Sequence, residues 1–415
     1  GDLNVRAVKD KNDNIISDGR PSLGFTGNMD TYKPAEGSAT RSDIAITDPD
    51  FKYPSLWKSN IAADYKFGDG WVATVELLYS KDINAIYHDN IGLYRTEQFV
   101  NDGGAGNARP YYNGYYSDRE GNQKAANHVV MLRNTSKGHS LYTTFQLQKN
   151  FVDGILKGLY LNGSYSFGQS RGVTDGTSSV ATSAWKYRAA LDGNAEEVGY
   201  TAGSFDGRLL LSASYTANWS KYAATSFGLI YQRYRPFRYS YCYNGDANGD
   251  SQFSNDLMYI PANFDEVKDH LLPGDFDSQE DAWKAMNAFI EQDPYLSKHR
   301  GEYAERNGAV APFANQLDLS VSHDIKIYQK NGRSHTLRFS FNIANFLNLL
   351  NRNWGVVQTT VLGNQQYQFL TIPKGQGPSA ANNYTLKYTM AKDLDETFKD
   401  NLNDVSRWQM QFGIK

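Results

Sequence analysis

The chain has 415 residues, a formal net charge of -3 and a single cysteine, and aromatic residues make up 14% of it. The near-neutral charge argues against a nucleic-acid-binding surface, because such surfaces are strongly basic. One cysteine cannot form a disulfide within the chain, so cysteine pairing says nothing about the cellular compartment. No stretch approaches the roughly 18 consecutive apolar residues of a transmembrane helix, so the sequence argues against a helical membrane protein.

Alternation of apolar and polar residues with a period of two dominates the chain, in segments of roughly ten residues. Between Leu209 and Trp219 the odd-numbered residues are all apolar, and the even-numbered residues after Leu210 are all polar. This pattern is typical of strands with one apolar face, and about ten to twelve such strands are predicted. The clearest predicted strands cover residues 61–67, 71–79, 159–167, 209–219, 317–327 and 336–343.

The connections between these strands alternate between short and long. Tight turns are predicted at 68–70, 153–157 and 330–334. A membrane β-barrel has short turns at one rim and long loops at the other. The predicted fold class is therefore all-β, a transmembrane antiparallel β-barrel with long extracellular loops. These predicted loops cover about 95–127, 168–206 and 241–311.

One segment in the longest loop departs from the strand pattern. Residues 278–292 place Trp283, Met286 and Phe289 at helical spacing. Ser278 is a suitable N-cap, and acidic residues follow it in the first turn. A short helix is therefore predicted over 278–292.

The same loop contains a stretch rich in Asn and Asp. Asp246, Asn248 and Asp250 have the one-three-five spacing of the oxygen ligands in calcium loops. The sixth position is Ser251 instead of the usual glycine, and the twelfth is Leu257 instead of glutamate. The sequence therefore predicts either a calcium site at the first three residues or an ordinary Asn/Asp-Gly turn.

Two aromatic and basic clusters are candidate ligand-binding surfaces. Tyrosines offer flat amphipathic faces that stack on sugar rings or cover a peptide, although loop tyrosines also pack on one another. Arginines mixed with tyrosines at the end of a strand bind an anion or meet lipid headgroups. The candidates are Tyr111, Tyr112, Tyr115 and Tyr116 in the first cluster, and Arg235 and Arg238 in the second.

Motifs for catalysis are absent from the sequence. It contains no Gly-x-Ser-x-Gly elbow, no phosphate-binding glycine loop and no His-x-x-x-His pair. The seven histidines show no ligand spacing. We therefore expect that the protein is not an enzyme.

Two stretches, NDLMYIP at 255–261 and DPYLSKHRGEYAERNGAVAPFANQLDLSVSHDI at 293–325, resemble the barrel of TonB-dependent outer-membrane transporters. They are most similar to the Oar-like group of Bacteroidetes. In that group an Asn/Asp-rich loop leads to an NDL-x-YIP motif, then to a KHRGEYAERN-like segment and a strand. The resemblance is best over 207–350 and looser elsewhere, including the alternating residues 408–414.

The resemblance implies that residues 1–415 form the C-terminal part of one plugged barrel of about 22 strands. A plug domain and the first barrel strands are then expected upstream of this stretch. The implied function is TonB-dependent active uptake of a nutrient across the bacterial outer membrane, the nutrient being a peptide, a glycan or a metal chelate. The implied partners are the TonB complex acting through the plug and the lipid bilayer with its lipopolysaccharide. Whether a surface lipoprotein lid is a further partner is left open by the sequence.

Two other functions remain open at this point. A structural or adhesive outer-membrane β-barrel would have no plug domain. A soluble carbohydrate-binding β-sandwich would carry the polar strand face as its solvated outside and would stay monodisperse without detergent. Calcium in the Asn/Asp-rich loop is the one cofactor that the sequence suggests.

Overall fold

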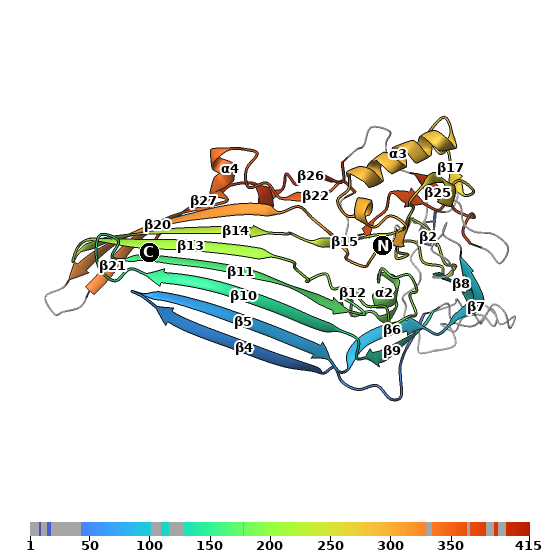
Figure 1. Ribbon diagram of the computed structural model, residues 1–415, viewed down its shortest axis with the longest axis horizontal. Helices are drawn as coiled ribbons and strands as arrows, with labels where there is room; N and C mark the ends of the chain where they lie inside the picture. The colour runs from blue at the N-terminus through green and yellow to red at the C-terminus, as the bar shows by residue number, and fades with distance from the viewer. Residues whose placement is uncertain are drawn as a thin grey trace.

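The computed structural model describes most of the chain, and the elements below belong to that part. Long antiparallel strands dominate it, which confirms the predicted all-β class (Figure 1). No helix among these residues is long and apolar enough to cross a membrane. The described residues are 8–9, 15–17, 43–100, 109–115, 128–176, 178–328, 334–362, 366–378, 386–388 and 396–415.

One sheet of ten strands contains every described strand of more than eight residues (Figure 1), and we call the nine strands of its main path the long strands. These nine follow the order β27-β21-β20-β14-β13-β11-β10-β5-β4, and the two-residue strand β12 pairs with β11 beside that path. Each long strand is the neighbour of the next long strand along the chain, so the sheet is an up-and-down meander. All six strands that the alternation predicted are confirmed. The nine strands are β4 (Leu56–Phe67), β5 (Trp71–Asp82), β10 (His139–Asn150), β11 (Leu159–Gly172), β13 (Arg208–Ser220), β14 (Ala223–Tyr234), β20 (Ala314–Tyr328), β21 (Ser334–Ala344) and β27 (Gln409–Ile414).

The two faces of this sheet differ in chemistry because the strand register keeps like residues side by side. Leu229 of β14 pairs with Ala213 on one side and Leu319 on the other. The apolar residues therefore form one continuous face, and many of them are exposed. On the opposite face the polar side chains bond across strands, as in the pair Gln146 and Asn162 at 2.9 Å.

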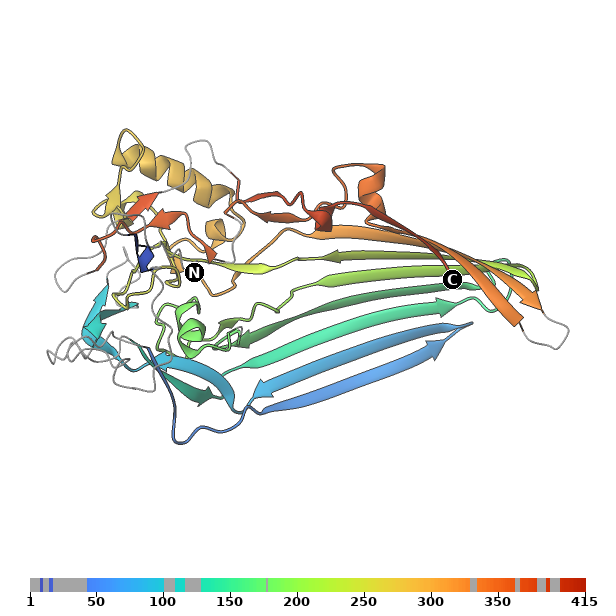
Figure 2. The same ribbon diagram turned by 180° about the vertical axis from the view of Figure 1, so that it is seen from behind.

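The short and long connections lie at opposite ends of the sheet (Figures 1 and 2). The predicted turns at 68–70 and 153–157 are confirmed between β4 and β5 and between β10 and β11. Four residues of the turn predicted at 330–334 lie outside the described residues, and Ser334 begins β21. The long connections cover 83–138, 173–207, 235–313 and 345–408.

These four long connections differ from the predicted loops in their bounds. The predicted loop 168–206 begins at 173, because β11 continues to Gly172. The predicted loop 95–127 contains parts of strands β7 and β8, which pair with each other. The fourth connection, 345–408, was not predicted as a loop at all.

The long connections pack together, and we call their described residues the loop assembly. Its main hydrophobic core joins residues from three connections, and a second cluster joins Leu93, Tyr112 and Val130 to Trp185. All of the buried residues of the main core lie outside the nine long strands. The largest fully buried apolar side chains of this core are Tyr239, Tyr241, Tyr243, Phe289, Tyr367 and Phe369.

Helix α3 (Gln279–Gln292) covers one side of this core and confirms the predicted helix. The Ser278 side chain caps it by accepting a hydrogen bond from the Asp281 amide. Met286 and Phe289 lie on its buried face. The other short helices are α2 (Ala181–Lys186), α4 (Phe346–Leu350), η2 (Phe264–Glu266), η3 (Leu296–Lys298) and η4 (Asp404–Ser406).

Short strands complete the described structure. β1 and β2 pair with each other, and β12 pairs with β11. The remainder form small sheets of two or three strands in the loop assembly, where β3, which precedes β4, pairs with β9. Their bounds are β1 (Val8–Lys9), β2 (Ile15–Ser17), β3 (Ile44–Thr47), β6 (Ala85–Asn90), β7 (Leu93–Val100), β8 (Arg109–Tyr115), β9 (Val129–Thr135), β12 (Gly199–Tyr200), β15 (Arg238–Tyr241), β16 (Tyr259–Ile260), β17 (Leu271–Leu272), β18 (Glu302–Tyr303), β19 (Ala309–Val310), β22 (Gln358–Thr360), β23 (Gln366–Tyr367), β24 (Leu370–Thr371), β25 (Leu386–Tyr388) and β26 (Phe398–Asp400).

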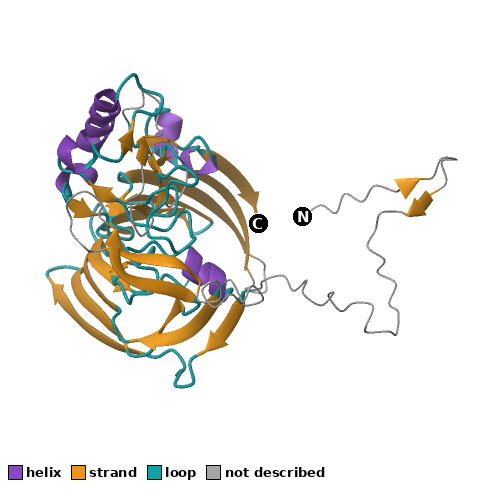
Figure 3. Cartoon of the chain, turned by 90° about the vertical axis from the view of Figure 1, so that its right-hand side faces the viewer, coloured by secondary structure: helices purple, strands orange, loops and turns teal. Residues whose placement is uncertain are grey.

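The large sheet is curved when it is viewed along its length (Figure 3), and its two edges are β4 and β27. All eight pairings along the path are antiparallel. An even number of antiparallel steps brings the last strand back to the direction of the first. β4 and β27 therefore run in the same direction and cannot form an antiparallel pair with each other.

Candidate functional site

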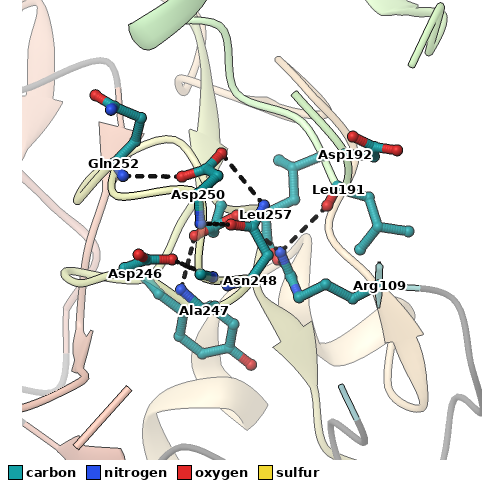
Figure 4. Close-up of polar contacts among 12 residues, drawn as sticks. Arg109, Leu191, Asp192, Asp246, Ala247, Asn248, Asp250, Gln252 and Leu257 are labelled. Carbon is teal, nitrogen blue, oxygen red and sulfur yellow. Dashed lines mark hydrogen bonds and ion pairs between the residues drawn. The ribbon is translucent and has the colours of Figure 1, made fainter. Parts of the chain in front are cut away.

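The Asn/Asp-rich stretch forms a tight loop in the assembly, folded around its own carboxylates (Figure 4). Asp246 Oδ1 accepts hydrogen bonds from the amides of Asn248 at 3.2 Å and Gly249 at 2.6 Å, and its Oδ2 accepts from the Ser251 amide at 2.8 Å. Asx turns of this kind explain why Asn, Asp and Gly dominate the stretch. The loop is thus held by side chains that also offer oxygen ligands.

Three carboxylates converge in this loop. One oxygen from each of Asp246, Asp250 and Asp256 lies within 4.8 Å of the others. Asp250 and Asp256 are buried, and Asp246 is partly buried. Asp250 also accepts from the amide of Gln252 at 2.8 Å, and Asp256 accepts from the amide of Ala247 at 2.8 Å. Oxygen clusters of this type suit hard cations.

Arg109 supplies the positive charge beside this cluster (Figure 4). It begins β8, is fully buried, and its Nη1 lies 3.0 Å from Asp256 Oδ1. Its other terminal nitrogen donates to the Leu257 carbonyl. The guanidinium also lies 5.7 Å from the ring centre of Tyr243 and 5.5 Å from that of Tyr303. One cation therefore offsets part of the charge of three acids.

The electrostatics follow from burial and from this imbalance. Burial, and then the neighbouring Asp246, raise the pKa of Asp250 to about 7. Burial also raises the pKa of Asp256 well above its ordinary value, although Arg109 opposes that shift. Two of the three acids are buried and only one arginine offsets their charge, so burial and mutual repulsion favour protonation within the cluster.

The carboxylate cluster contains two of the three residues predicted to bind calcium, Asp246 and Asp250, and not the third, Asn248. Asn248 turns its amide into the loop, where its Oδ1 accepts from the Asp250 amide at 2.9 Å and its Nδ2 lies 3.3 Å from Asp250 Oδ2. Asp256 takes the third place in the cluster. Calcium binding stays a prediction. A calcium titration of thermal unfolding tests it, with Asp246→Ala combined with Asp250→Ala as the variant.

The predicted tyrosine cluster adjoins this loop, but most of its surface is buried. Tyr111 and Tyr112 are buried, and Tyr115 is half-buried. The Tyr112 hydroxyl donates to Asp192 at 2.7 Å, and the Tyr112 amide donates to the Asn248 carbonyl at 2.7 Å. Tyr116 lies outside the described residues. The buried rings hold two loops together, so the geometry favours packing over stacking on a ligand.

The predicted arginine pair lies elsewhere in the assembly, and its nitrogens contact protein groups. Arg238 is buried, and its Nη2 donates to Asp206 at 3.1 Å. Arg235 lies 3.2 Å from the same carboxylate and donates to the Ala311 carbonyl at 2.7 Å. Its guanidinium also covers the ring of Phe313. Anion binding by the pair stays a prediction, and the geometry gives it no support.

Sequence reasoning did not select Arg109 or Asp256. Arg109 is separated from Asp256 by 147 positions, so no local pattern links them. Asp256 lies one position before the twelfth place of a calcium loop, and this mismatch kept it out of the predicted site.

Comparisons of this chain with protein-family models, with curated proteins and with solved structures give no match. The functional argument therefore depends on the residues and geometry described above.

Proposed function

We propose that the protein takes up a nutrient across the bacterial outer membrane in a TonB-dependent way, as part of a transmembrane β-barrel. The observation that carries this proposal is the continuous apolar face of the large sheet. Leu229, in the middle of β14, is 40% exposed, and Phe145 in the middle of β10 is 47% exposed. Apolar faces of this extent occur where a membrane or a partner covers them.

The magnitude of the hydrophobic effect supports a lipid contact. Burial of one large apolar side chain is worth about 1.5–3 kcal/mol. The face contains such residues on all nine long strands, among them Ile61, Leu211, Phe339 and Phe412. Leaving this whole face in water would cost tens of kcal/mol by that measure, which exceeds the net stability of ordinary domains. Lipid acyl chains remove that cost without a second protein layer.

The polar face supports the assignment of an inner wall. Asp324 forms a two-point ion pair with Arg338 at 2.6 and 2.7 Å, across two neighbouring strands. Thr144 and Ser166 bond at 2.9 Å, and Ser320 donates to Asn342 at 2.7 Å. A water-filled or plugged lumen would keep such groups hydrated.

Strand direction gives a further condition on a closed barrel. β4 and β27 run in the same direction, so an antiparallel barrel needs an odd number of further strands between them. Bacterial single-chain outer-membrane barrels have an even number of strands. The path contains nine strands, and an odd number of further strands brings the total to an even number. The observed strand directions are therefore compatible with such a barrel.

The alternatives have less support. A β-sandwich needs a second sheet against the apolar face, and the described residues place none there. A structural or adhesive barrel shares the same two faces and differs from a transporter in having no plug domain. The loop assembly at one end of the sheet is compatible with a transporter and with a structural or adhesive barrel.

Isolation of the protein from its own cells tests the proposal. We expect it in the outer-membrane fraction, soluble only in detergent, as a larger chain whose upstream peptides include a plug domain. The uptake proposal also requires that deletion of the TonB protein stops import. An outer-membrane chain without a plug would favour the structural alternative, and a soluble monodisperse chain would overturn both.

A further inference from the structure

A cleft in the loop assembly lies between a small sheet and helix α2. The sheet has the order β3-β9-β6, and α2 packs against β6 and β9. The cleft has a volume of about 560 Å³, and Thr47, His88, Leu132 and Ala184 line it. Small-ligand sites have volumes of roughly 300–1,000 Å³, so this cleft has room for a molecule of that size.

Strand register and small side chains create this space. Thr47 pairs with Leu132, and Leu132 pairs with His88, so these three residues form one row across the sheet. Opposite this row α2 presents Ala181 and Ala184. Two alanines on the helix leave open the volume that larger residues would fill.

One acidic side chain lies among the described residues that line the cleft. This side chain is Asp175, and the described lining residues include no lysine or arginine. The carboxylate accepts hydrogen bonds from the Ala202 amide at 2.8 Å and from Asn307 Nδ2 at 3.1 Å, which fix its position. It remains exposed and has further acceptor capacity. Burial and the charge of Arg188 lower the pKa of His88, so this ring adds no positive charge at pH 7.

The residues that line the cleft favour a peptide over a glycan or a metal chelate as its ligand. The described lining residues contain no Phe, Tyr or Trp on which a sugar ring could stack. The described lining also has no lysine or arginine that could pair directly with an anionic chelate. By contrast, Ala45, Ile86 and Leu132 share one face of the sheet and provide an apolar floor. Among the described strands β3 lies at the edge of its sheet, and its residues Ala45–Thr47 line the cleft. An edge strand can bond the main chain of an added peptide.

We propose that this cleft binds a short peptide with a free N-terminus and small apolar side chains. The ammonium group pairs with Asp175, the main chain adds to β3, and the side chains contact the apolar floor. This assignment rests on the proposed function, because it names the class of nutrient that is captured. It is independent of the Asp246 cluster.

Calorimetry on the full protein, isolated from its membranes in detergent, tests this assignment with tetra-alanine as the probe. N-acetyl-tetra-alanine lacks the ammonium group, and we expect it to bind at least about tenfold more weakly. Ala184→Trp fills the cleft and should abolish binding, whereas the matched variant Ala262→Trp, on an exposed loop, should leave it unchanged. The comparison of the two peptides needs no variant and so stands even if Ala184→Trp misfolds.

Three results would overturn the peptide assignment: equal binding of the acetylated peptide, displacement of tetra-alanine by maltotetraose, or full binding by Ala184→Trp. Absence of binding by any probe would also overturn it. If the protein nevertheless fractionates with the outer membrane and supports TonB-dependent growth, the uptake proposal survives. Failure of both sets of measurements would remove both proposals.

Discussion

The large sheet and the loop assembly differ in where they place their large apolar side chains. The sheet leaves large apolar residues such as Leu229 and Phe145 exposed, whereas the loop assembly buries Tyr241, Phe289 and Tyr367 almost completely. Under the proposed function an apolar surrounding covers the sheet, whereas the loops carry a core of the kind found in water-soluble domains. The two regions should respond differently to the same class of mutation.

The largest effect is expected from loss of the buried arginine in the loop assembly. Arg109→Met leaves Asp256 buried without its partner, and such a loss costs about 3–5 kcal/mol. We expect faster hydrogen exchange throughout the loop assembly and unchanged exchange in the nine long strands. Asp256→Asn as a second substitution should restore part of the protection. Equal loss of protection in the long strands would show that the two regions are not separate.

The second largest effect is expected from an arginine substitution on the apolar face of the sheet, compared with the same substitution on the polar face. Leu229 and Ile230 are neighbours with similar exposure, 40% and 48%, on opposite faces of β14. Arginine on a lipid-facing position near the middle of the bilayer costs about 2–4 kcal/mol. Leu229→Arg should therefore reduce the folded protein in the outer membrane, while Ile230→Arg should be tolerated. Equal yields of both variants would contradict a lipid contact at the apolar face.

A smaller effect is expected at the start of α3. Ser278 Oγ accepts from the Asp281 amide at 3.1 Å, and loss of such a cap costs about 1 kcal/mol. Ser278→Ala should lower protection in the first turn of α3, measured by hydrogen exchange, and Ser278→Asp should keep it. If alanine and aspartate behave alike, the cap contributes nothing to the loop assembly.

The smallest effect concerns acidification. Burial, and then Lys186, lower the pKa of His128, so protonation favours the unfolded state. The stability contributed by the neutral ring is present above the ordinary pKa of about 6.5 and is lost as the pH falls below it. The parent should therefore lose more loop-assembly protection than His128→Gln between pH 7.5 and 5. Asp250 has a raised pKa and acts in the opposite direction, so the difference between the two proteins isolates His128.

Local chemistry made much of the fold predictable. The period-two alternation in 209–219 and 317–327 located strands, because a pleated strand sends alternate side chains to opposite faces. The helical spacing of Trp283, Met286 and Phe289 located the helix. Ser278 marked its start, because a serine at the N-cap satisfies an amide of the first turn. Neither prediction needed information from distant residues.

The loop assembly was decided by tertiary structure, because its contacts join positions far apart in the chain. Arg109 pairs with Asp256 across 147 positions. The nitrogens of Arg238 donate to Asp206 and the Ser204 carbonyl of another connection, and to the Asn307 carbonyl of its own. Asp256 lies in the same loop as Asp246 and Asp250, and only its partner Arg109 comes from a distant connection. Sequence alone determined which segments extend or coil, since backbone preference and face periodicity are local. Which loop residues stay free for a ligand depends on partners that only the folded chain brings together.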